Sequence, residues 1–230
     1  MALKPVPDFD RLARPYRWME FFSFGPWLAL TRRTFLDELS GARHAIVLGD
    51  GDGRFTARLL GVNPIIRVDA VDASAAMLRA LTRRAHPHTG RLRTHLADIR
   101  TWAPQPTAEI PCDLIATHFF LDCLTSEEVL SLAGKLRQVC TPSARWVVSD
   151  FAIPPGLFGR LIAGPLIACL YFAFARLTGL AVRRLPDHTA ALRQAGFTRI
   201  ERRTRLGGLL IAEMWQTSAA IDLTPSEASL

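Results

Sequence analysis

A turn of closely spaced glycines, between a strand-like run and a helix-like run, constrains the fold of this chain more than any other stretch. The apolar residues 45–48 lead into Gly49, Gly51 and Gly53, and from Phe55 onward apolar residues recur with helical spacing. Glycines at such a turn let the backbone pass under a ligand with no Cβ in the way. The amino terminus of the following helix favours polar or anionic ligand groups. The stretch therefore predicts a strand, a tight turn and a helix, with the turn as a candidate binding site.

The spacing of these glycines discriminates between two nucleotide-type ligands. A dinucleotide fingerprint requires G-x-G-x-x-G, but in the two available registers its last position falls on Arg54 or Thr56. The alternate spacing instead resembles motif I of the class I methyltransferases that use S-adenosylmethionine (SAM). A simple turn without a ligand is the remaining interpretation. The pattern thus favours SAM as the cofactor and disfavours an NAD-type oxidoreductase.

Composition places the chain among globular proteins. Its 230 residues suffice for one α/β domain, and 49% of them are hydrophobic, which argues against disorder. The four cysteines form no C-x-x-C pair, so we expect buried thiols rather than disulfides or a metal site. The amino terminus carries no apolar signal region. These features predict a cytoplasmic protein.

The net charge of +7 comes almost entirely from arginine, with Lys4 and Lys135 as the only lysines. Arginine suits phosphate binding, so a nucleic-acid partner has to be considered. However, the arginines are scattered, and their densest groups are pairs such as Arg32-Arg33 and Arg83-Arg84. We therefore interpret them as a solvated surface and expect no nucleic-acid partner.

Periodicity and turn residues predict strands that alternate with helices. The expected strands are residues 44–48, 66–71, 91–96, 112–117, 145–150, 198–205 and 209–216. The expected helices are 53–60, 74–84, 125–139 and 187–195, preceded by helical periodicity in 8–40 with a division at Gly25-Pro26. Gly207-Gly208 indicates a hairpin. We divide the chain into a helical cap (1–40), one main domain (41–216) and a flexible tail (217–230).

Such alternation predicts a parallel sheet with helices on both faces. Five parallel strands followed by an antiparallel hairpin resemble the Rossmann-like, seven-stranded fold of class I methyltransferases, over roughly residues 40–216. The nearest-looking branch is the one that acts on small molecules and lipid quinones. This resemblance implies SAM as the cofactor and a small, apolar or lipid-like acceptor. Acceptors such as nucleic-acid or amide nitrogens are disfavoured, because no Asn/Asp-Pro-Pro-aromatic motif follows residues 112–117.

Two aspartates at expected strand ends match acidic positions of the resembled family. Residues 71–78, VDASAAML, place Asp72 where the family binds the ribose hydroxyls. Asp98 follows the third strand, where the family binds the adenine amine and uses the next apolar residue, here Ile99, against the ring. Met77 would cover the other ring face. An aspartate that only ends a strand or caps a helix is the alternative for each.

The remaining cofactor candidates surround these positions. Asp50, inside the glycine turn, is a candidate for the ammonium of the methionine moiety, because Val47 occupies the place where many relatives carry an acid. Ala73 and Thr117 lie at strand ends beside the expected cleft. Tyr16, one turn before Glu20, would belong to an aromatic-rich cap over the ligand, although such aromatic residues equally suit a core.

His118 and Asp122, after the fourth strand, are the candidate catalytic residues. The unperturbed pKa of histidine, about 6.5, suits a general base. A structural imidazole is the alternative. Asp150 and His188 are weaker candidates, and either could simply end a strand or begin a helix. We expect no metal, because no cluster has metal-ligand spacing, and in-line methyl transfer mainly requires correct orientation of the reactants.

Residues 155–182 interrupt the alternation with a long apolar stretch. Its uncharged part, between Arg160 and Arg176, is too short to span a bilayer, and Gly164-Pro165 should break or kink it. A core helix, an interfacial helix at a membrane surface and a lid over the acceptor remain open. In the lid interpretation, Leu170 and Phe174 share the inner face.

The sequence therefore predicts a SAM-dependent methyltransferase acting on a small, apolar acceptor. A non-catalytic protein that binds SAM or a membrane surface is the main alternative. Neither the methylated atom, nor the acceptor, nor the oligomeric state follows from the sequence.

Overall fold

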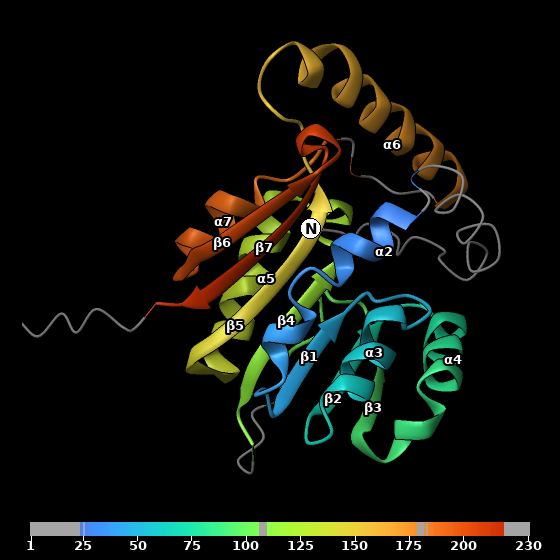
Figure 1. Ribbon diagram of the computed structural model, residues 1–230, viewed down its shortest axis with the longest axis vertical. Coiled ribbons are helices and arrows are strands. Elements are labelled where there is room, and N and C mark those ends of the chain that lie inside the picture. The colour runs from blue at the N-terminus through green and yellow to red at the C-terminus, as the bar shows by residue number, and fades with distance from the viewer. Residues whose placement is uncertain (1–23, 25, 106–109, 179–181, 183, 219–230) are drawn as a thin grey trace, which may run out of the picture.

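The computed structural model describes residues 24, 26–105, 110–178, 182 and 184–218. Its centre is a seven-stranded sheet with the order β3-β2-β1-β4-β5-β7-β6 (Figure 1). The strands are β1 (His44–Leu48), β2 (Arg67–Asp72), β3 (Leu92–Leu96), β4 (Cys112–His118), β5 (Cys140–Phe151), β6 (Phe197–Arg205) and β7 (Leu210–Thr217). β1 to β5 pair in parallel, and β7 runs antiparallel to both β5 and β6. The predicted fold class, including its terminal hairpin, is confirmed.

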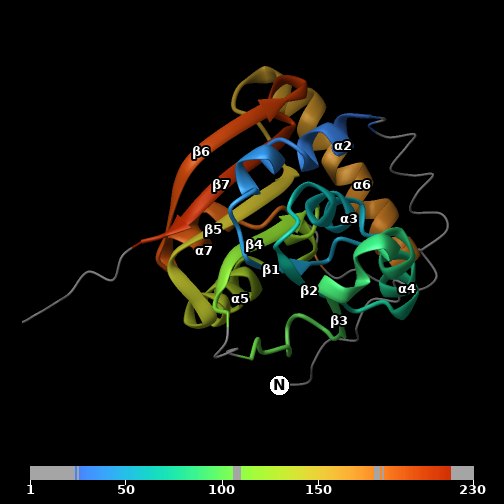
Figure 2. The ribbon, with the colours of Figure 1, turned by 60° about the horizontal axis from the view of Figure 1, so that its bottom comes forward.

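Helices cover both faces of the sheet (Figure 2). One face is packed by α3 (Arg54–Val62), α4 (Ala75–Arg84) and the short turn Leu36–Leu39, and the other by α5 (Ser126–Val139) and α7 (His188–Gln194). The two largest fully buried side chains, Trp146 and Trp215, lie on the second face. Such burial of a strand on both sides explains why the central strands read as continuous apolar runs.

Local signals placed several helix ends correctly. α5 begins with the expected capping box, in which Thr125 Oγ1 accepts from the Glu128 amide at 3.2 Å and the Glu128 carboxylate accepts from the Thr125 amide at 2.8 Å. Ser74 caps α4 by accepting from the Met77 amide at 3.1 Å. The helix α2 spans Pro26–Arg32.

Several boundaries differ from the expected ones, and β5 differs most. β5 begins at Cys140, five residues before the expected start at 145, because Pro142 and Ser143 resemble loop residues although they extend a paired strand. β7 continues through Thr217, which pairs with Phe197, so the tail begins one residue later than predicted. The turn at His86–Arg91 was not predicted as helical.

The apolar stretch after β5 forms a helix over the carboxyl ends of the strands (Figure 1). A π-helical turn at Gly159–Ala163 continues into α6 (Gly164–Thr178), and the Gly164 amide donates to the Gly159 carbonyl. Gly164-Pro165 therefore does not end the helix, and the irregularity expected there is the π-helical turn, whose wider spacing accommodates the proline. Gly159 is required here, since a Cβ would collide with the Pro154 carbonyl. Among the described residues, no helix has the length and apolarity to cross a bilayer.

Candidate functional site

The glycine turn lies at the carboxyl end of β1, and its glycines have different roles. All of them have positive φ: 63° at Gly49, 58° at Gly51 and 80° at Gly53. A Cβ at Gly49 would overlap the Phe120 ring, and one at Gly53 would overlap Leu81, so these two glycines permit close packing. At Gly51 the nearest contact of a Cβ would be the Met77 sulfur, at 3.9 Å. Gly51 is therefore the position at which a ligand can approach the backbone most closely.

Asp50 points from this turn toward the first turn of α3. Its carboxylate accepts from the amides of Thr56 at 2.8 Å and Phe55 at 3.3 Å. Burial raises the pKa of Asp50, while these hydrogen bonds and the charge of Arg32 oppose that shift. The carboxylate thus stabilises the helix terminus, and its predicted contact with a ligand ammonium would use the lone pairs that remain.

Asp72 and its neighbours come together at the end of β2. Its Oδ1 accepts from the Ser74 amide at 2.9 Å, and its carbonyl accepts from the Ala97 amide at 3.1 Å. The same turn starts α4 and brings Met77 against Gly51. The structure therefore gathers Asp72, Ala73, Met77 and Gly51 around one edge of the sheet, as the sequence predicted.

Asp98 carries a partner that the sequence did not reveal. The Arg100 guanidinium donates to both of its carboxylate oxygens, at 3.0 Å from Nε and 2.7 Å from Nη2. These hydrogen bonds hold the pKa of Asp98 below its usual value. Ile99 is only 8% exposed and packs into the core. A ligand amine would therefore share Asp98 with Arg100, and the Ile99 side chain is mostly withdrawn from the cleft.

Thr117 and His118 end β4 and point to opposite faces of the sheet, as neighbouring strand residues do. Thr117 is fully buried, and its hydroxyl accepts from Trp146 Nε1 at 2.9 Å. The Thr117 side chain lies on the face of the sheet that α5 and α7 cover. This geometry contradicts a cofactor contact through that side chain.

His118 is held as a neutral imidazole. Ser149 Oγ donates to the Thr31 carbonyl at 3.2 Å and accepts from His118 Nδ1 at 2.9 Å, so Nδ1 carries the proton. Nε2 is buried and has no hydrogen-bond partner in the described part of the chain. Burial, aided by Arg32, lowers the pKa of His118 to about 3. Such a weakly basic imidazole speaks against the predicted general base, because a base should have a pKa near the working pH.

Phe119 turns the chain sharply after β4. Its φ is 54°, a left-handed conformation that costs a non-glycine residue about 1–3 kcal/mol. The turn directs Phe119 toward Phe151, with ring centroids 5.2 Å apart, and toward Arg32, whose guanidinium lies 5.0 Å from the ring. Phe120 instead packs on Gly49. The expected place of Arg32 on a solvated surface was wrong, because this residue is only 7% exposed.

Asp122 and Asp150 form a pair in which Asp150 is buried and Asp122 is partly buried. Asp150 accepts from the Asp122 amide at 3.2 Å and from the Phe151 amide at 2.8 Å. Burial raises the pKa of Asp122 to about 6. Burial and the charge of Asp122 also raise the pKa of Asp150 well above its usual value. Because two carboxylates this close disfavour joint ionisation, the pair retains a proton more readily than isolated aspartates do.

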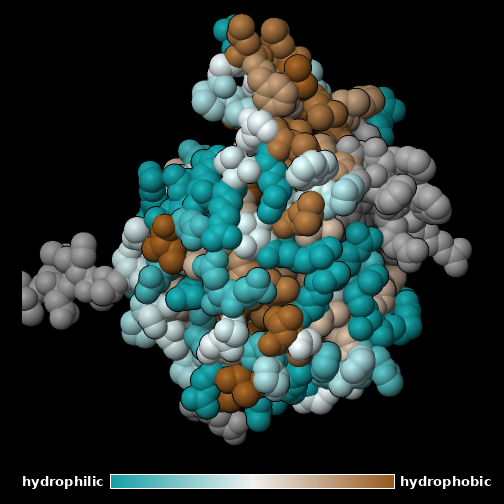
Figure 3. Space-filling model, viewed as in Figure 1, coloured by the Kyte–Doolittle hydropathy of each residue, from teal (hydrophilic) through white to brown (hydrophobic). Residues whose placement is uncertain are grey.

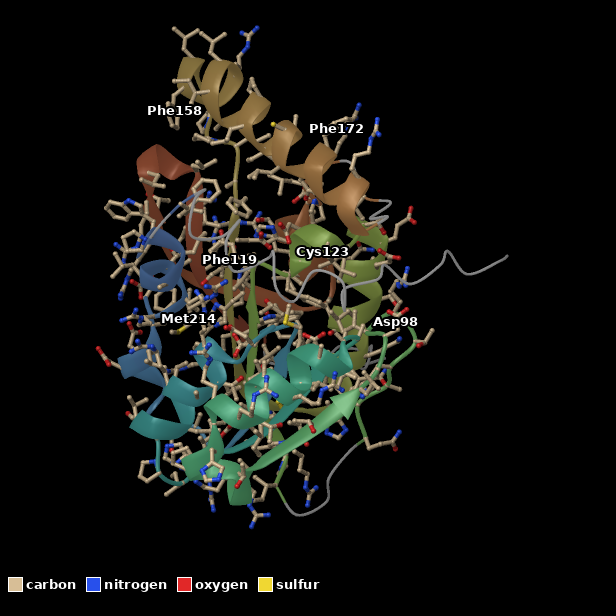
Figure 4. All side chains as sticks on the ribbon, turned by 90° about the vertical axis from the view of Figure 1, so that its right-hand side faces the viewer. Asp98, Phe119, Cys123, Phe158, Phe172 and Met214 are labelled. Carbon is tan, nitrogen blue, oxygen red and sulfur yellow. The ribbon has the colours of Figure 1, made fainter. Side chains whose placement is uncertain are left out.

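Cys123 and Tyr171 surround this pair, and the sequence had indicated neither. The Tyr171 hydroxyl on α6 donates to the Asp122 carbonyl at 2.7 Å and so ties the helix to the site. Burial and the charges of Asp122, Asp150 and Asp72 raise the pKa of the Cys123 thiol. Figure 4 shows Cys123 and Phe119 between α6 and the strand ends. Asp72 and the Asp122–Asp150 pair therefore face the same region.

His188 lies in a different environment. Its Nε2 contacts the buried Glu213 carboxylate at 3.1 Å, and Glu213 also pairs with Arg199 at 2.8 Å. This ion cluster fixes α7 to β6 and β7, so the proposed role of His188 in substrate orientation is not supported. Tyr16 and Glu20 lie outside the described residues, and nothing further follows for them.

The described residues fit the expected cofactor. Gly51 offers an approachable backbone, and Asp72 and Met77 flank it, all at the carboxyl edge where ligands of open α/β sheets bind. Asp72 would hold the ribose hydroxyls, Met77 would cover the base, and Asp98 would receive the amine together with Arg100.

Comparison with known proteins agrees with this arrangement. Residues 46–143 match a family model described as a methyltransferase domain. The chain is 39% identical over 130 residues to the trans-aconitate 2-methyltransferase of Paracidovorax citrulli (strain AAC00-1), an alignment that covers 56% of this chain but only 39% of that protein.

Solved structures share the fold. The SAM-dependent methyltransferase SibL is 23% identical with a TM-score of 0.64, and the match covers 94% of this chain and 64% of SibL. An O-methyltransferase family protein from Burkholderia thailandensis is 16% identical (TM-score 0.63; 93% and 65% covered). The N-methyltransferase NodS from Bradyrhizobium japonicum WM9 is 14% identical (TM-score 0.57; 83% and 97% covered).

Proposed function

We propose that this chain transfers a methyl group from SAM to a small-molecule acceptor, because residues 46–143 match a methyltransferase-domain model and the fold is shared with a SAM-dependent methyltransferase. The single observation that carries the proposal is the gathering of Gly51, Asp72 and Met77 at the carboxyl edge of the sheet. The bound cofactor would supply an electrophilic methyl group on a sulfonium. The protein would supply orientation, which is the dominant requirement of an in-line displacement.

The acceptor site proposed here lies between α6 and the strand ends. Ala163 of the π-helical turn and Ile167 and Tyr171 of α6 pack in one cluster with Phe119 and Leu210. An acceptor bound there would contact the edge of this apolar cluster. Such a lining favours an apolar small molecule with one polar reacting group.

For proton removal we propose Asp122 rather than His118. An acceptor hydroxyl or amine that attacks the methyl carbon must lose its proton, and the carboxylate of Asp122 would take it. Its pKa of about 6 is better matched to neutral pH than the imidazole at about 3. Asp150, through its hydrogen bond with the Asp122 amide, would keep this side chain in place.

The carboxyl pair also bears on the charge of the acceptor. The curated relative is named for trans-aconitate, which is an anion at neutral pH. Asp122 and Asp150 would repel a carboxylate placed beside them. We therefore propose a neutral or cationic acceptor for this protein.

The test is incubation with SAM labelled in its methyl group and a panel of neutral, cationic and anionic small molecules. Label transfer to a neutral or cationic compound, with release of demethylated cofactor, would support the proposal. Calorimetric binding of SAM without transfer to any compound would indicate a non-catalytic SAM-binding protein. Binding of NAD in place of SAM would contradict the cofactor assignment itself.

A further inference from the structure

The outward face of the helix after β5 is apolar and exposed. Its most exposed side chains are Leu157 (72%), Leu161 (70%), Phe172 (62%) and Ile162 (55%). Figure 3 shows apolar surface gathered at this end of the molecule, while most of the rest of the visible face is polar. Monomeric soluble proteins seldom expose adjacent large apolar side chains of this kind unless the patch binds a partner.

This exposure does not result from loose packing of the helix. Gly159, Ala163, Ile167 and Tyr171 recur every four residues and are buried against the body of the protein. One face of the helix thus packs against the core. The residues on the opposite face are not needed for that packing. An ordinary surface helix would have polar residues there.

All charged residues of this segment have the same sign. Residues 151–186 contain four arginines and no aspartate or glutamate, although the whole chain has 21 acidic residues. Arg160 and Arg176 are exposed, and the Arg176 guanidinium lies 5.1 Å from the Phe172 ring centroid. Arginine chains can lie along apolar surface and still place their charge among lipid head groups.

We propose that the outer face of residues 157–176 docks on an anionic lipid bilayer, with Leu157, Leu161, Ile162 and Phe172 inserted below the head groups and Arg160 and Arg176 paired with lipid phosphates. The exposed apolar side chains and the acid-free arginine flank together match the two parts of such a surface. A second copy of the chain fits less well, because its own arginines would meet these arginines without an acidic partner. This docking goes beyond methyl transfer and requires neither cofactor nor acceptor.

Flotation with phosphatidylcholine vesicles, with and without phosphatidylglycerol, tests the proposal in the full chain. We expect binding only to the anionic vesicles and at least about tenfold weaker binding of the Leu161→Ser/Phe172→Ser double variant. Arg160→Gln/Arg176→Gln should weaken binding at low salt and reduce its salt dependence. The matched control is Val62→Ser/Ile65→Ser, which removes side chains of similar exposure (48% and 60%) on a distant surface and should bind as the wild type does.

Cys169 provides a direct measure of insertion, because it is the exposed cysteine of the chain and lies in α6. An environment-sensitive fluorophore on Cys169 should shift to the blue with anionic vesicles and be quenched by spin-labelled lipid. Absence of vesicle binding overturns the proposal. So does equal binding to neutral vesicles at high salt, because the arginines would then have no role. A wild-type dimer in sedimentation that Leu161→Ser/Phe172→Ser converts to monomer, without vesicle binding, would assign the face to a second copy instead.

Discussion

At the amino edge of the sheet polar side chains pair with one another, whereas the carboxyl edge holds an imidazole nitrogen with no partner among the described residues and two aspartates with raised pKa values. His44 directs Nδ1 to the Ile110 carbonyl at 2.9 Å and Nε2 to Asp69 at 2.7 Å, and His95 contacts the other oxygen of Asp69 at 2.8 Å. The buried Asn63 side chain makes four hydrogen bonds to backbone groups. Every polar atom of this group contributes to stability.

The carboxyl edge has the opposite character. It contains the His118 nitrogen that lacks a partner among the described residues, the left-handed Phe119, and the Asp122–Asp150 pair with raised pKa values. Proteins retain such unfavourable features mainly where function requires them. We therefore expect substitutions of polar side chains at the amino edge to change mainly stability, and those of polar side chains at the carboxyl edge to change mainly ligand binding.

The largest effect is expected at the glycine turn. Gly49→Ala should lower the free energy of unfolding by about 3 kcal/mol or more, because the new Cβ meets Phe120 at a φ of 63°. Gly41→Ala and Gly90→Ala, at positions with open space and no positive φ, should change it by less than about 0.5 kcal/mol. Urea denaturation measures all three. Similar stabilities would mean that the packing of Phe120 on Gly49 is not required.

The next largest effect is expected along β2, where substitutions of two aspartates should change SAM binding and stability separately. Asp72→Ala should weaken SAM binding at least about tenfold, since charge-assisted hydrogen bonds are worth about 1.5–3 kcal/mol each. Asp69→Ala, three residues earlier, should leave SAM affinity unchanged but destabilise the fold, because His44 and His95 lose their acceptor. Calorimetric titration and thermal unfolding of both variants check this. Equal SAM affinity of folded Asp72→Ala and wild type would remove Asp72 from the cofactor site.

The two edges should also respond to pH in different windows. The raised pKa of Asp122, about 6, means that the fold favours its protonated form, so stability falls as pH rises from about 4 to 6. Asp122→Asn should remove that fall and raise stability at neutral pH by about 1.4 kcal/mol for each unit of pKa difference.

The matched variant at the amino edge is His44→Asn. The hydrogen bond to Asp69 raises the pKa of His44 above 6.5. The stabilisation by protonated His44 is therefore complete below pH 6.5, and it is lost as the pH rises through the pKa of His44 in the folded protein. Unfolding curves across pH should lose this upper window in His44→Asn and keep the lower one. An unchanged profile in either variant would refute the assignment for that edge.

The smallest effect is expected where α6 is tied to the site. Tyr171→Phe removes the hydrogen bond to the Asp122 carbonyl, worth about 1 kcal/mol, and keeps the ring in the core. With an acceptor in hand, we expect a severalfold higher KM for that acceptor and unchanged SAM affinity. Loss of SAM affinity instead would place the helix over the cofactor rather than over the acceptor.

Local patterns in the sequence determined much of the architecture. The alternation of apolar runs and helical periods, the glycine turn after residue 48, the capping box at Thr125 and the hairpin at Gly207-Gly208 each depend on residues close together in the chain. Such patterns restrict backbone torsions and the face that an element buries, which is why the fold class and the position of Asp72 at a strand end followed from them.

The state of each site residue was decided only by tertiary structure. Thr117 and His118 are neighbours at the end of β4. The Thr117 hydroxyl accepts a hydrogen bond from Trp146, whereas burial beside Ser149 keeps the His118 imidazole neutral. Asp150 meets Asp122 across 28 residues, and Tyr171 reaches Asp122 across 49. Hydrogen-bond partners and proton affinity depend on which distant groups share a desolvated space. A sequence pattern specifies where a side chain leaves the backbone, but the packing of the whole sheet sets its dielectric surroundings and its neighbours.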